Sequence, residues 1–204
     1  SNRNIYSPFI SWYGFPEPVV SMNISSRNQA SIIFPCPGEP VGYSVCPFGT
    51  DVYNAFPGSE WIVQNGENCT SSTYSLNTTL HPRSAAGITA DNELVLFTVD
   101  GRNSGHSLGM YTSEVADMLV ELGAVNAINL DGGGSTTLTF ADPHPRVVNV
   151  PVGNGDPYTQ RKTANNLAVY ALSQSSLPPI VVLNDFEDGD EGTLFFEPEY
   201  SGST

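Results

Sequence analysis

Residues 94–140 read LVLFTVDGRNSGHSLGMYTSEVADMLVELGAVNAINLDGGGSTTLTF, and this stretch decides the fold. Its first six residues form a continuous apolar run with β-branched and aromatic members, which predicts a buried strand. Residues 125–130 predict a second strand and residues 136–140 a third. Upstream, residues 85–89 predict a short strand that turns at Asp91-Asn92 into the first run. The stretch therefore predicts an α/β (α+β) fold with a mixed, strand-rich sheet and few helices.

A helix is predicted between the two apolar strands. Thr112 or Ser113 would begin it, because either hydroxyl can accept from the free N–H groups of the first turn. Gly123 stands where a left-handed residue usually ends a helix. Four apolar residues recur at the spacing of one helix face: Val115, Met118, Leu119 and Leu122.

Two aspartates directly follow the apolar strands. Asp100 and Asp131 each precede glycine. A strand, a helical crossover and another strand usually join parallel strands, so both aspartates are expected at one edge of the sheet, where open α/β sheets bind ligands. If the strands are neighbours, ~4.8 Å apart, the carboxylates lie within several ångströms of each other. Glycoside hydrolysis uses two acidic groups roughly 5–10 Å apart.

Three consecutive glycines follow the second aspartate. Gly132, Gly133 and Gly134 cost backbone entropy and exceed what a turn needs. They predict close approach of backbone N–H groups to a ligand, and Ser135 adds a hydroxyl. Two structural explanations compete with this prediction: Asp-Gly is a common turn dipeptide, and glycines also permit close packing of the third strand on the second.

A family resemblance rests on six segments in order. They are WIVQNG (61–66), HPRSAAG (81–87), VDGR (99–102), TSEVADML (112–119), NAINLDGGGS (126–135) and RKTANNLAVYAL (161–172). Together they resemble the phosphodiester glycosidase family over more than half of the chain. An Asn-Gly-Gly-Phe-type segment that members carry upstream is not found in this sequence, so part of one wall of the site is expected to be missing.

The resemblance implies a hydrolase that cleaves the glycosidic bond of sugar-1-phosphodiesters, with N-acetylglucosamine as the favoured released sugar. It implies a phosphorylated glycan or glycoprotein as substrate, no cofactor, and a role connected with mannose 6-phosphate on lysosomal enzymes. Asp131 is the preferred base or nucleophile, Asp100 would orient substrate or share the proton, and Arg83 would bind phosphate bidentately. The predicted substrate-binding residues are Gly101, Arg102, Gly132, Gly133, Gly134 and Ser135.

Arg83 and two further candidates, His106 and Glu114, have structural alternatives. Arg83 would be a surface arginine paired with one of the many acids. His106, on the loop after Asp100, would reach the same edge or simply be exposed. Glu114 stands in the first helical turn, where a carboxylate interacts favourably with the helix dipole, and this explains it without catalysis.

The charge of the chain argues against one class of partner. The 204 residues include 21 acidic and 7 basic side chains, for a formal net charge of -14. Nucleic-acid binding depends on clustered lysine and arginine, so it is not expected. The longest apolar runs fall short of the ~18 residues of a transmembrane helix, so no membrane segment is predicted in this chain.

The cysteines and glycosylation sequons favour a secreted protein or one in the lumen of the secretory pathway. Cys36 and Cys46 are close in a Pro/Gly-rich loop and could bridge, which leaves Cys69 free or paired outside this segment. Three free thiols are the alternative, and the cysteine spacing predicts no metal site. The predicted glycosylation sites are Asn23, Asn68 and Asn77.

The chain divides into three predicted parts. Residues 1–58 are expected to be irregular with a few short strands, either part of the domain or packed on it. Residues 59–172 form the phosphodiester glycosidase domain, in which 142–157 cross the surface as a loop and 163–171 return as a strand. Residues 173–204 are an acidic linker or the start of a second module.

Two rival functions remain open. A carbohydrate- or phosphoglycan-binding module without turnover is the first alternative, favoured by the upstream segment that is not found and by the partial C-terminal module. The second is a Ca²⁺ site made by Asp100, Asp131 and nearby carbonyls. It is disfavoured because Ca²⁺ takes six to eight oxygens and the aspartates lack the spacing of a calcium loop.

Overall fold

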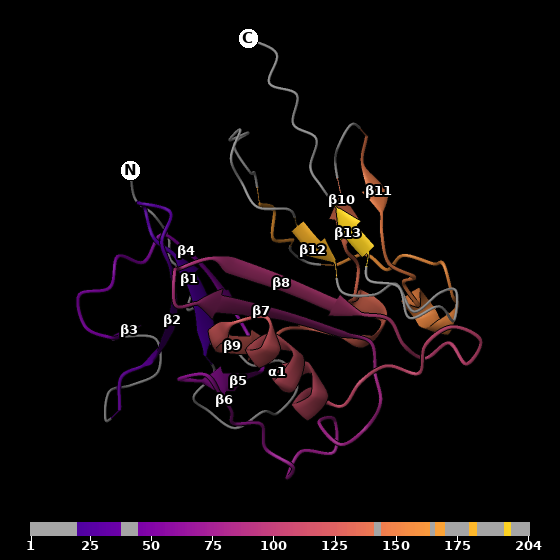
Figure 1. The fold of residues 1–204 in the computed structure, drawn as a ribbon, viewed down its shortest axis with the longest axis horizontal. Coiled ribbons are helices and arrows are strands. Elements are labelled where there is room, and N and C mark those ends of the chain that lie inside the picture. Colours follow the sequence, from indigo (N-terminus) through magenta and orange to yellow (C-terminus); the bar gives the residue numbers. More distant parts are fainter. Residues whose placement is uncertain are drawn as a thin grey trace.

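The computed structural model describes residues 20–37, 45–140, 144–163, 166–169, 180–182 and 194–196. Figure 1 shows that this part of the chain is built mostly from sheets. One α-helix, α1 (Thr112–Glu121), occurs among the described residues. The predicted mixed, strand-rich α+β class is therefore confirmed.

A five-stranded sheet is the centre of the fold. Its strand order is β6-β5-β9-β7-β8, so β7 lies between β8 and β9 and is antiparallel to both. It follows that β8 and β9 run parallel to each other, as the strand–helix–strand pattern predicts, but they are not neighbours. The strands are β5 (Glu60–Gln64), β6 (Glu67–Asn68), β7 (Arg83–Thr89), β8 (Leu94–Val99) and β9 (Ala124–Asn129).

The predicted burial of the first apolar strand is wrong. Strand β8 is at the edge of the sheet, and most of its residues are only half-buried. Its partner β7 is buried along most of its length. The edge strand pairs with β7 through the predicted turn, where Asn92 has a φ of 63°.

Helix α1 covers one face of this sheet (Figure 1). Val115, Ala116 and Leu119 are fully buried against β5, β7 and β9, whereas the predicted Met118 and Leu122 are only partly buried. The apolar face is therefore turned slightly from the predicted one. Gly123 ends the helix at a φ of 86°, as predicted.

The helix begins differently from the prediction. Its N-cap is Tyr111, and the Tyr111 backbone N–H donates to Glu114 Oε2 at 2.7 Å. Thr112 does not cap the helix, because its hydroxyl donates to Asn77 Oδ1 at 3.1 Å. Glu114 therefore has a structural role at the start of the helix, and this role accounts for it without catalysis.

A second sheet covers the other face. Met22, Ile32 and Val20 pack on Ala86 and Ile128 of the central sheet. The short strands expected in the N-terminal segment are present, and in the described residues they pair into one sheet. The second sheet has the order β3-β2-β1-β4, with β1 (Ser21–Ile24), β2 (Ala30–Pro35), β3 (Val45–Cys46) and β4 (Asn54–Pro57).

The segments after β9 depart most from the sequence-based expectations. Only Thr139–Phe140 (β10) of the predicted third strand is extended, and Gly133–Ser135 is a 3-10 turn, η1. The 142–157 segment is more than a surface loop, because Arg146–Val147 (β11) pairs with β10, a second 3-10 turn η2 (Gly153–Gly155) follows, and Val150 and Val152 are buried. The predicted strand at 163–171 is wrong for its described residues, which are exposed and irregular.

Three further features concern the covalent frame and the C-terminal region. A disulfide joins Cys36 to Cys46, and Cys69 is a free, exposed thiol. Ile180–Val182 (β12) pairs with Leu194–Phe196 (β13), while the acidic run at 185–191 lies outside the described residues. Within the described part of the chain, no helix has the length and apolar character needed to span a membrane.

Candidate active site

The candidate site lies at the edge of the central sheet where β8 and β9 end. Val99 and Asn129 close these strands, and Arg83 opens β7 between them. Asp100 and Asp131 therefore follow strands that end at the same edge but are two strand spacings apart, about 9.6 Å. The condition that the two strands are neighbours is not met, because β7 occupies the intervening position.

Glycines bring the loops after β8 and β9 together over the start of β7. A Cβ added at Gly109 would lie 2.4 Å from the His81 carbonyl, and one added at Gly101 would lie 2.6 Å from Pro82 N. On the other side, a Cβ at Gly132 would lie 2.7 Å from the Pro82 carbonyl oxygen. Real side chains do not tolerate such approaches, so both loops are held against the His81-Pro82 backbone.

Arg102 bridges the two loops. Its backbone is left-handed, with a φ of 57°, which is uncommon for a residue other than glycine. Its guanidinium lies against Gly133, where an added Cβ would be 2.9 Å from Nη1. Arg102 Nε and Nη2 each lie 3.2 Å from His81 Nδ1. Burial lowers the pKa of His81, and the positive charges of Arg102 and Arg83 lower it further.

Asp131 is the accessible acid of the site. Its side chain is 61% exposed, and its Oδ2 lies 3.8 Å from Arg161 Nη2. The same arginine nitrogen donates to the Ser135 hydroxyl. Arg161 also covers Gly134, where an added Cβ would be 3.4 Å from Nη1. Two exposed arginines, Arg102 and Arg161, therefore flank one glycine loop that begins with a carboxylate.

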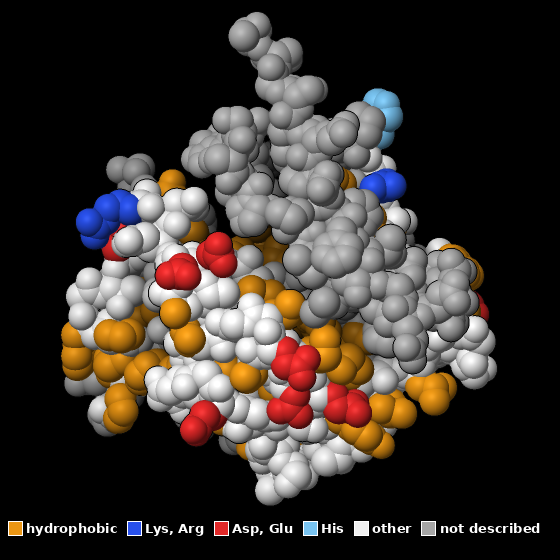
Figure 2. Space-filling view, in the orientation of Figure 1, with side chains coloured by type: hydrophobic (Ala, Val, Ile, Leu, Met, Phe, Trp, Pro, Cys, Tyr) orange, Lys and Arg blue, Asp and Glu red, His pale blue; other side chains and the backbone are white. Residues whose placement is uncertain are grey.

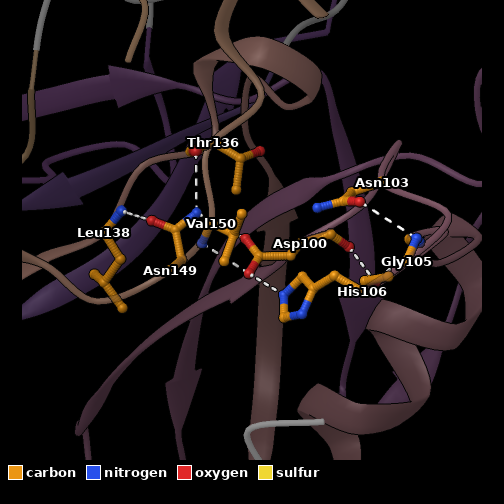
Figure 3. A network of polar contacts seen from close by, with 10 residues as sticks. Asp100, Asn103, Gly105, His106, Thr136, Leu138, Asn149 and Val150 are labelled. Atoms are coloured by element: carbon orange, nitrogen blue, oxygen red, sulfur yellow. Dashed lines mark hydrogen bonds and ion pairs between the residues drawn. The ribbon is translucent and has the colours of Figure 1, made fainter. Parts of the chain in front are cut away.

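Asp100 is held in a network of donors instead of facing solvent. Its carboxylate accepts from Asn149 Nδ2 and Val150 N, both at 2.8 Å, and lies 3.0 Å from His106 Nε2. Figure 3 shows Asp100 between His106 on one side and the 149–150 segment on the other. The side chains of Asp100 and His106 are each only 14% exposed. This network connects the loop after β8 to the segment that follows β11.

Arg83 does not lie in the site as predicted. Only 5% of it is exposed, and its guanidinium donates to the carbonyl oxygens of Leu76, Thr79 and Met110 at 2.5, 2.8 and 3.1 Å. The alternative of a surface arginine is also wrong. Arg83 and Ala85 are two residues apart along β7, so the Arg83 side chain points to the same α1 face as Ala85 and fixes the 76–80 loop.

Glu60 lies near Arg83 on the same face. Burial raises the pKa of Glu60, and this outweighs the lowering by the Asn77 hydrogen bond and by Arg83. Burial also lowers the pKa of Arg83, although the Glu60 charge opposes this. Glu60 Oε1 and Asn129 Oδ1, on directly paired residues, are both buried without a hydrogen-bond partner. A proton on the Glu60 carboxyl would supply a hydrogen-bond donor for Asn129 Oδ1.

Sequence reasoning left three residues of this region unassigned. His81 and Arg161 each open a segment that resembles the family, and this was a usable signal. Asn149 had no signal, because it lies in a proline-rich stretch without periodicity.

Among the described residues, no group of three or more His, Cys, Asp and Glu side chains could hold a metal ion. A cavity of about 380 Å³ lies away from this edge and includes Asn92 of the β7–β8 turn.

The three sequon asparagines have different environments. Asn23 is fully buried on β1, and its Nδ2 donates to Ser31 and to the Asp51 carbonyl. Asn77 is also buried, and its Nδ2 donates to the Ser71 carbonyl at 2.7 Å. A glycan on either nitrogen would disrupt these bonds, so the fold disfavours both sites. Asn68 is exposed, although its Nδ2 also donates to the Ser113 carbonyl oxygen and to Asp117 Oδ1, and its glycosylation stays a prediction.

The fold and this edge define a strand-rich α+β domain with an exposed acid and two arginines around a glycine loop. The chain belongs to the phosphodiester glycosidase family, whose model matches residues 21–170. The family supports a hydrolase role. The match begins within the N-terminal sheet and includes the region before residue 61, for which the sequence suggested no resemblance.

Curated relatives match a smaller part of the chain. N-acetylglucosamine-1-phosphodiester alpha-N-acetylglucosaminidase of Bos taurus is 35% identical over 97 residues, which covers 41% of this chain and 18% of that protein. The SPbeta prophage-derived uncharacterized protein YomE of Bacillus subtilis is 36% identical over 85 residues, 41% of this chain and 13% of that protein. The chain thus spans less than a fifth of the length of these relatives.

A solved structure also resembles the chain. The zebrafish N-acetylglucosamine-1-phosphodiester alpha-N-acetylglucosaminidase catalytic domain, auto-inhibited by its pro-peptide, is 26% identical, and the match covers 58% of this chain and 41% of that one with a TM-score of 0.45.

Proposed function

We propose that this chain hydrolyses sugar-1-phosphodiesters by cleaving the bond between the anomeric carbon and the phosphate oxygen. The observation that carries the proposal is the exposed Asp131 carboxylate, 3.8 Å from Arg161, in a glycine loop that Arg102 also covers. Family membership supports the same reaction class. Arginine suits a phosphodiester because its planar fork donates to two phosphate oxygens at once.

Each residue has a distinct role in this reaction. Asp131 activates a water molecule or attacks the anomeric carbon directly. The C1–O bond breaks, and its electron pair leaves with the phosphate as a monoester. Because this is already a good leaving group, protonation matters less than charge stabilisation. Arg102 and Arg161 supply that stabilisation, and Ser135 donates to a substrate oxygen once Arg161 turns toward the phosphate.

The predicted roles of Asp100 and Arg83 change in this proposal. The Asp100 carboxylate already accepts from two donors and contacts His106, so we assign it to holding the loop that carries Arg102. The Arg83 guanidinium is occupied by three carbonyl oxygens, so phosphate binding passes to Arg102 and Arg161.

The favoured sugar is N-acetylglucosamine, since relatives in three mammals carry that sugar in their names. We further propose a secretory or secreted location, which the Cys36–Cys46 disulfide supports because such bonds persist in oxidising compartments. A phosphorylated glycan or glycoprotein connected with the mannose 6-phosphate mark is the corresponding proposed substrate.

The decisive experiment measures sugar release from an N-acetylglucosamine-1-phosphate diester of mannose. Asp131→Asn is expected to lower kcat at least about 1,000-fold, as loss of a catalytic base or nucleophile does. Its Tm should stay within a degree or two of the wild type, because the side chain is 61% exposed. Asp91→Asn, an exposed aspartate in the β7–β8 turn, is the matched control and should keep full activity.

The same assay separates the rival functions. Full activity in Asp131→Asn would remove Asp131 from the mechanism. Saturable binding of the diester to the wild type, with no sugar released over long incubation, would indicate a carbohydrate- or phosphoglycan-binding module. Activity that disappears with a chelator and returns with Ca²⁺ would instead support the calcium site.

A further inference from the structure

His81 has a contact that the proposed reaction leaves unexplained. Its Nδ1 lies 3.2 Å from both Nε and Nη2 of Arg102. Arginine has only donors, so Nδ1 must be the acceptor and a neutral His81 must carry its proton on Nε2. In the described part of the chain, no protein group hydrogen-bonds Nε2. The contact with Arg102 is therefore the polar interaction that fixes the ring.

The kind of acceptor matters for the charge of Arg102. An arginine is commonly oriented by a carboxylate, which also neutralises it. None of the ion pairs of the described residues involves Arg102. A neutral imidazole instead directs the guanidinium while leaving its full positive charge for another anion.

The surroundings hold this arrangement in place. His81 is fixed at the start of β7, because Gly101 and Gly109 pack on its backbone and on Pro82 too closely for any Cβ. Arg102 has a left-handed backbone that places its side chain over the glycine loop. Strained residues of this kind concentrate at functional sites.

We propose that His81 is a positioning residue, whose neutral imidazole orients Arg102 over Gly133 and leaves the guanidinium charge available to the anionic group of a ligand. The identity of that anion as a phosphodiester rests on the proposed function. The arrangement itself rests on the contacts of His81, Arg102 and the glycine loop.

The arrangement predicts sensitivity to acid. Protonated His81 has no acceptor and repels Arg102. Two charged groups face the ring: Arg102, from the loop after β8, and Arg83, from β7. Burial favours the neutral form of the ring, and both positive charges favour it too. The pKa of His81 therefore lies below its ordinary value of 6.5. Anion binding should persist at neutral pH and weaken as the pH falls through this lowered value.

The test uses dimethyl phosphate, a diester that keeps its single charge across the acidic and neutral range, with binding followed by NMR. His81→Ala should weaken binding about tenfold at about pH 7.5, equivalent to about 1.4 kcal/mol. His81→Asn keeps an oxygen acceptor close to the Nδ1 position, so it should bind within about twofold of the wild type. At an acidic pH below the lowered pKa of His81, binding by the wild type should weaken while binding by His81→Asn does not. His144→Asn, a change at an exposed histidine, is the control and should match the wild type at both pH values.

A second measurement does not depend on any variant of His81 folding. The chain has three histidines, so long-range ¹H–¹⁵N spectra should resolve them, with His106→Gln and His144→Asn assigning the other two. The Nε2–H tautomer is expected for His81, with titration below pH 6.5.

The Nδ1–H tautomer, equal binding by His81→Ala and wild type, or identical behaviour of the Ala and Asn variants would overturn the proposal. So would a wild type that does not bind dimethyl phosphate. Failure of this proposal can be distinguished from failure of the proposed function. A wild type that shows the predicted binding pattern but releases no sugar refutes hydrolysis alone, whereas sugar release unaffected by either His81 change refutes the positioning role alone.

Discussion

Arg102 combines a strained backbone with an exposed cation, so its two properties can be separated by mutation. At a φ of 57°, every residue except glycine and asparagine pays a conformational penalty. Arg102→Gly and Arg102→Ala should both lose anion binding, because both lack the guanidinium. The Gly variant should nevertheless be the more stable of the two by about 1 kcal/mol in urea unfolding. Equal stability, or a more stable Ala variant, would show that the left-handed conformation carries no strain.

Glu60 makes stability depend on pH. Because burial raises its pKa above 4.5, the folded protein retains a proton that the unfolded chain loses. The contribution of Glu60 to the free energy of unfolding is therefore fully present below pH 4.5. It is lost as the pH rises through the pKa that Glu60 has in the folded protein. Glu60→Gln imitates the protonated acid and can donate to the unpartnered Asn129 Oδ1. Its urea midpoint should exceed that of the wild type at pH 7 and match it near pH 4.

The control for this pH experiment is Glu67→Gln, which changes an exposed glutamate on the neighbouring strand β6. The urea midpoint of Glu67→Gln should vary with pH in the same way as that of the wild type. A Glu60→Gln profile that is also parallel to the wild type would mean that Glu60 is ionised in the fold.

At the scale of elements, adjacent glycines of the η1 loop should respond differently to alanine. A Cβ at Gly132 meets the Pro82 backbone at 2.7 Å, which cannot move, so Gly132→Ala should cost about 1–3 kcal/mol of stability. The three atoms nearest to a Cβ at Gly133 all belong to the movable guanidinium of Arg102. Gly133→Ala should therefore weaken dimethyl phosphate binding about tenfold, with a stability loss near 1 kcal/mol from its left-handed φ.

Gly66 provides the matched control for this pair. Its φ is 78°, and no atom lies within 4 Å of an added Cβ, so Gly66→Ala measures the backbone cost alone. It should match Gly133→Ala in stability and the wild type in binding. Normal binding by Gly133→Ala would show that Arg102 does not need its place over the loop.

Elements set by local signals were predictable from the sequence, but their neighbours were not. The strand at β8, the presence of α1 and its Gly123 terminator depend on local signals and are confirmed, whereas the predicted burial of β8 and part of the predicted α1 face are not. The position of β7 between β8 and β9 depends on pairing across the sheet, which no local pattern specifies. The predicted third strand, 136–140, is extended only at Thr139–Phe140, and the residues before it, Gly133–Ser135, form the η1 turn that packs on other loops.

The site was predictable only where residue type limits chemistry. The sequence singled out Asp131 and the glycines, whose roles are proposals; Arg83, predicted to bind phosphate, is buried, because the direction of its side chain depends on strand parity. Arg83 lies on the same face of β7 as Ala85, so its interior position follows once the helix-facing side of β7 is known. Asn149 lies 49 residues from Asp100, and only the folded chain brings the two together.

At the scale of the whole molecule, a net charge of -14 surrounds a site proposed to bind an anion. Figure 2 shows acidic side chains gathered on the face over α1, where Glu114, Asp117 and Glu121 are exposed. This field repels anionic substrates at long range, and salt screens it. For a sugar-1-phosphodiester, kcat/KM should rise about two- to threefold between about 10 and 100 mM NaCl.

Sodium sulfate at equal ionic strength is the control for this screening effect. Sulfate should inhibit where chloride activates, because it competes for Arg102 and Arg161. A fall of kcat/KM with rising NaCl from the lowest concentration would instead mean that the local arginines, and not the total charge, govern the approach of substrate.

The close packing of the His81-Pro82 dipeptide has a consequence for how this domain can diversify. The loops after β8 and β9 both pack against this dipeptide. Neither loop can be lengthened or take another path there without displacing the other. New substrate preferences should therefore arise through side-chain replacements along the loops, or through insertions distant from the His81-Pro82 contact. The path of the main chain at this contact should be inherited unchanged.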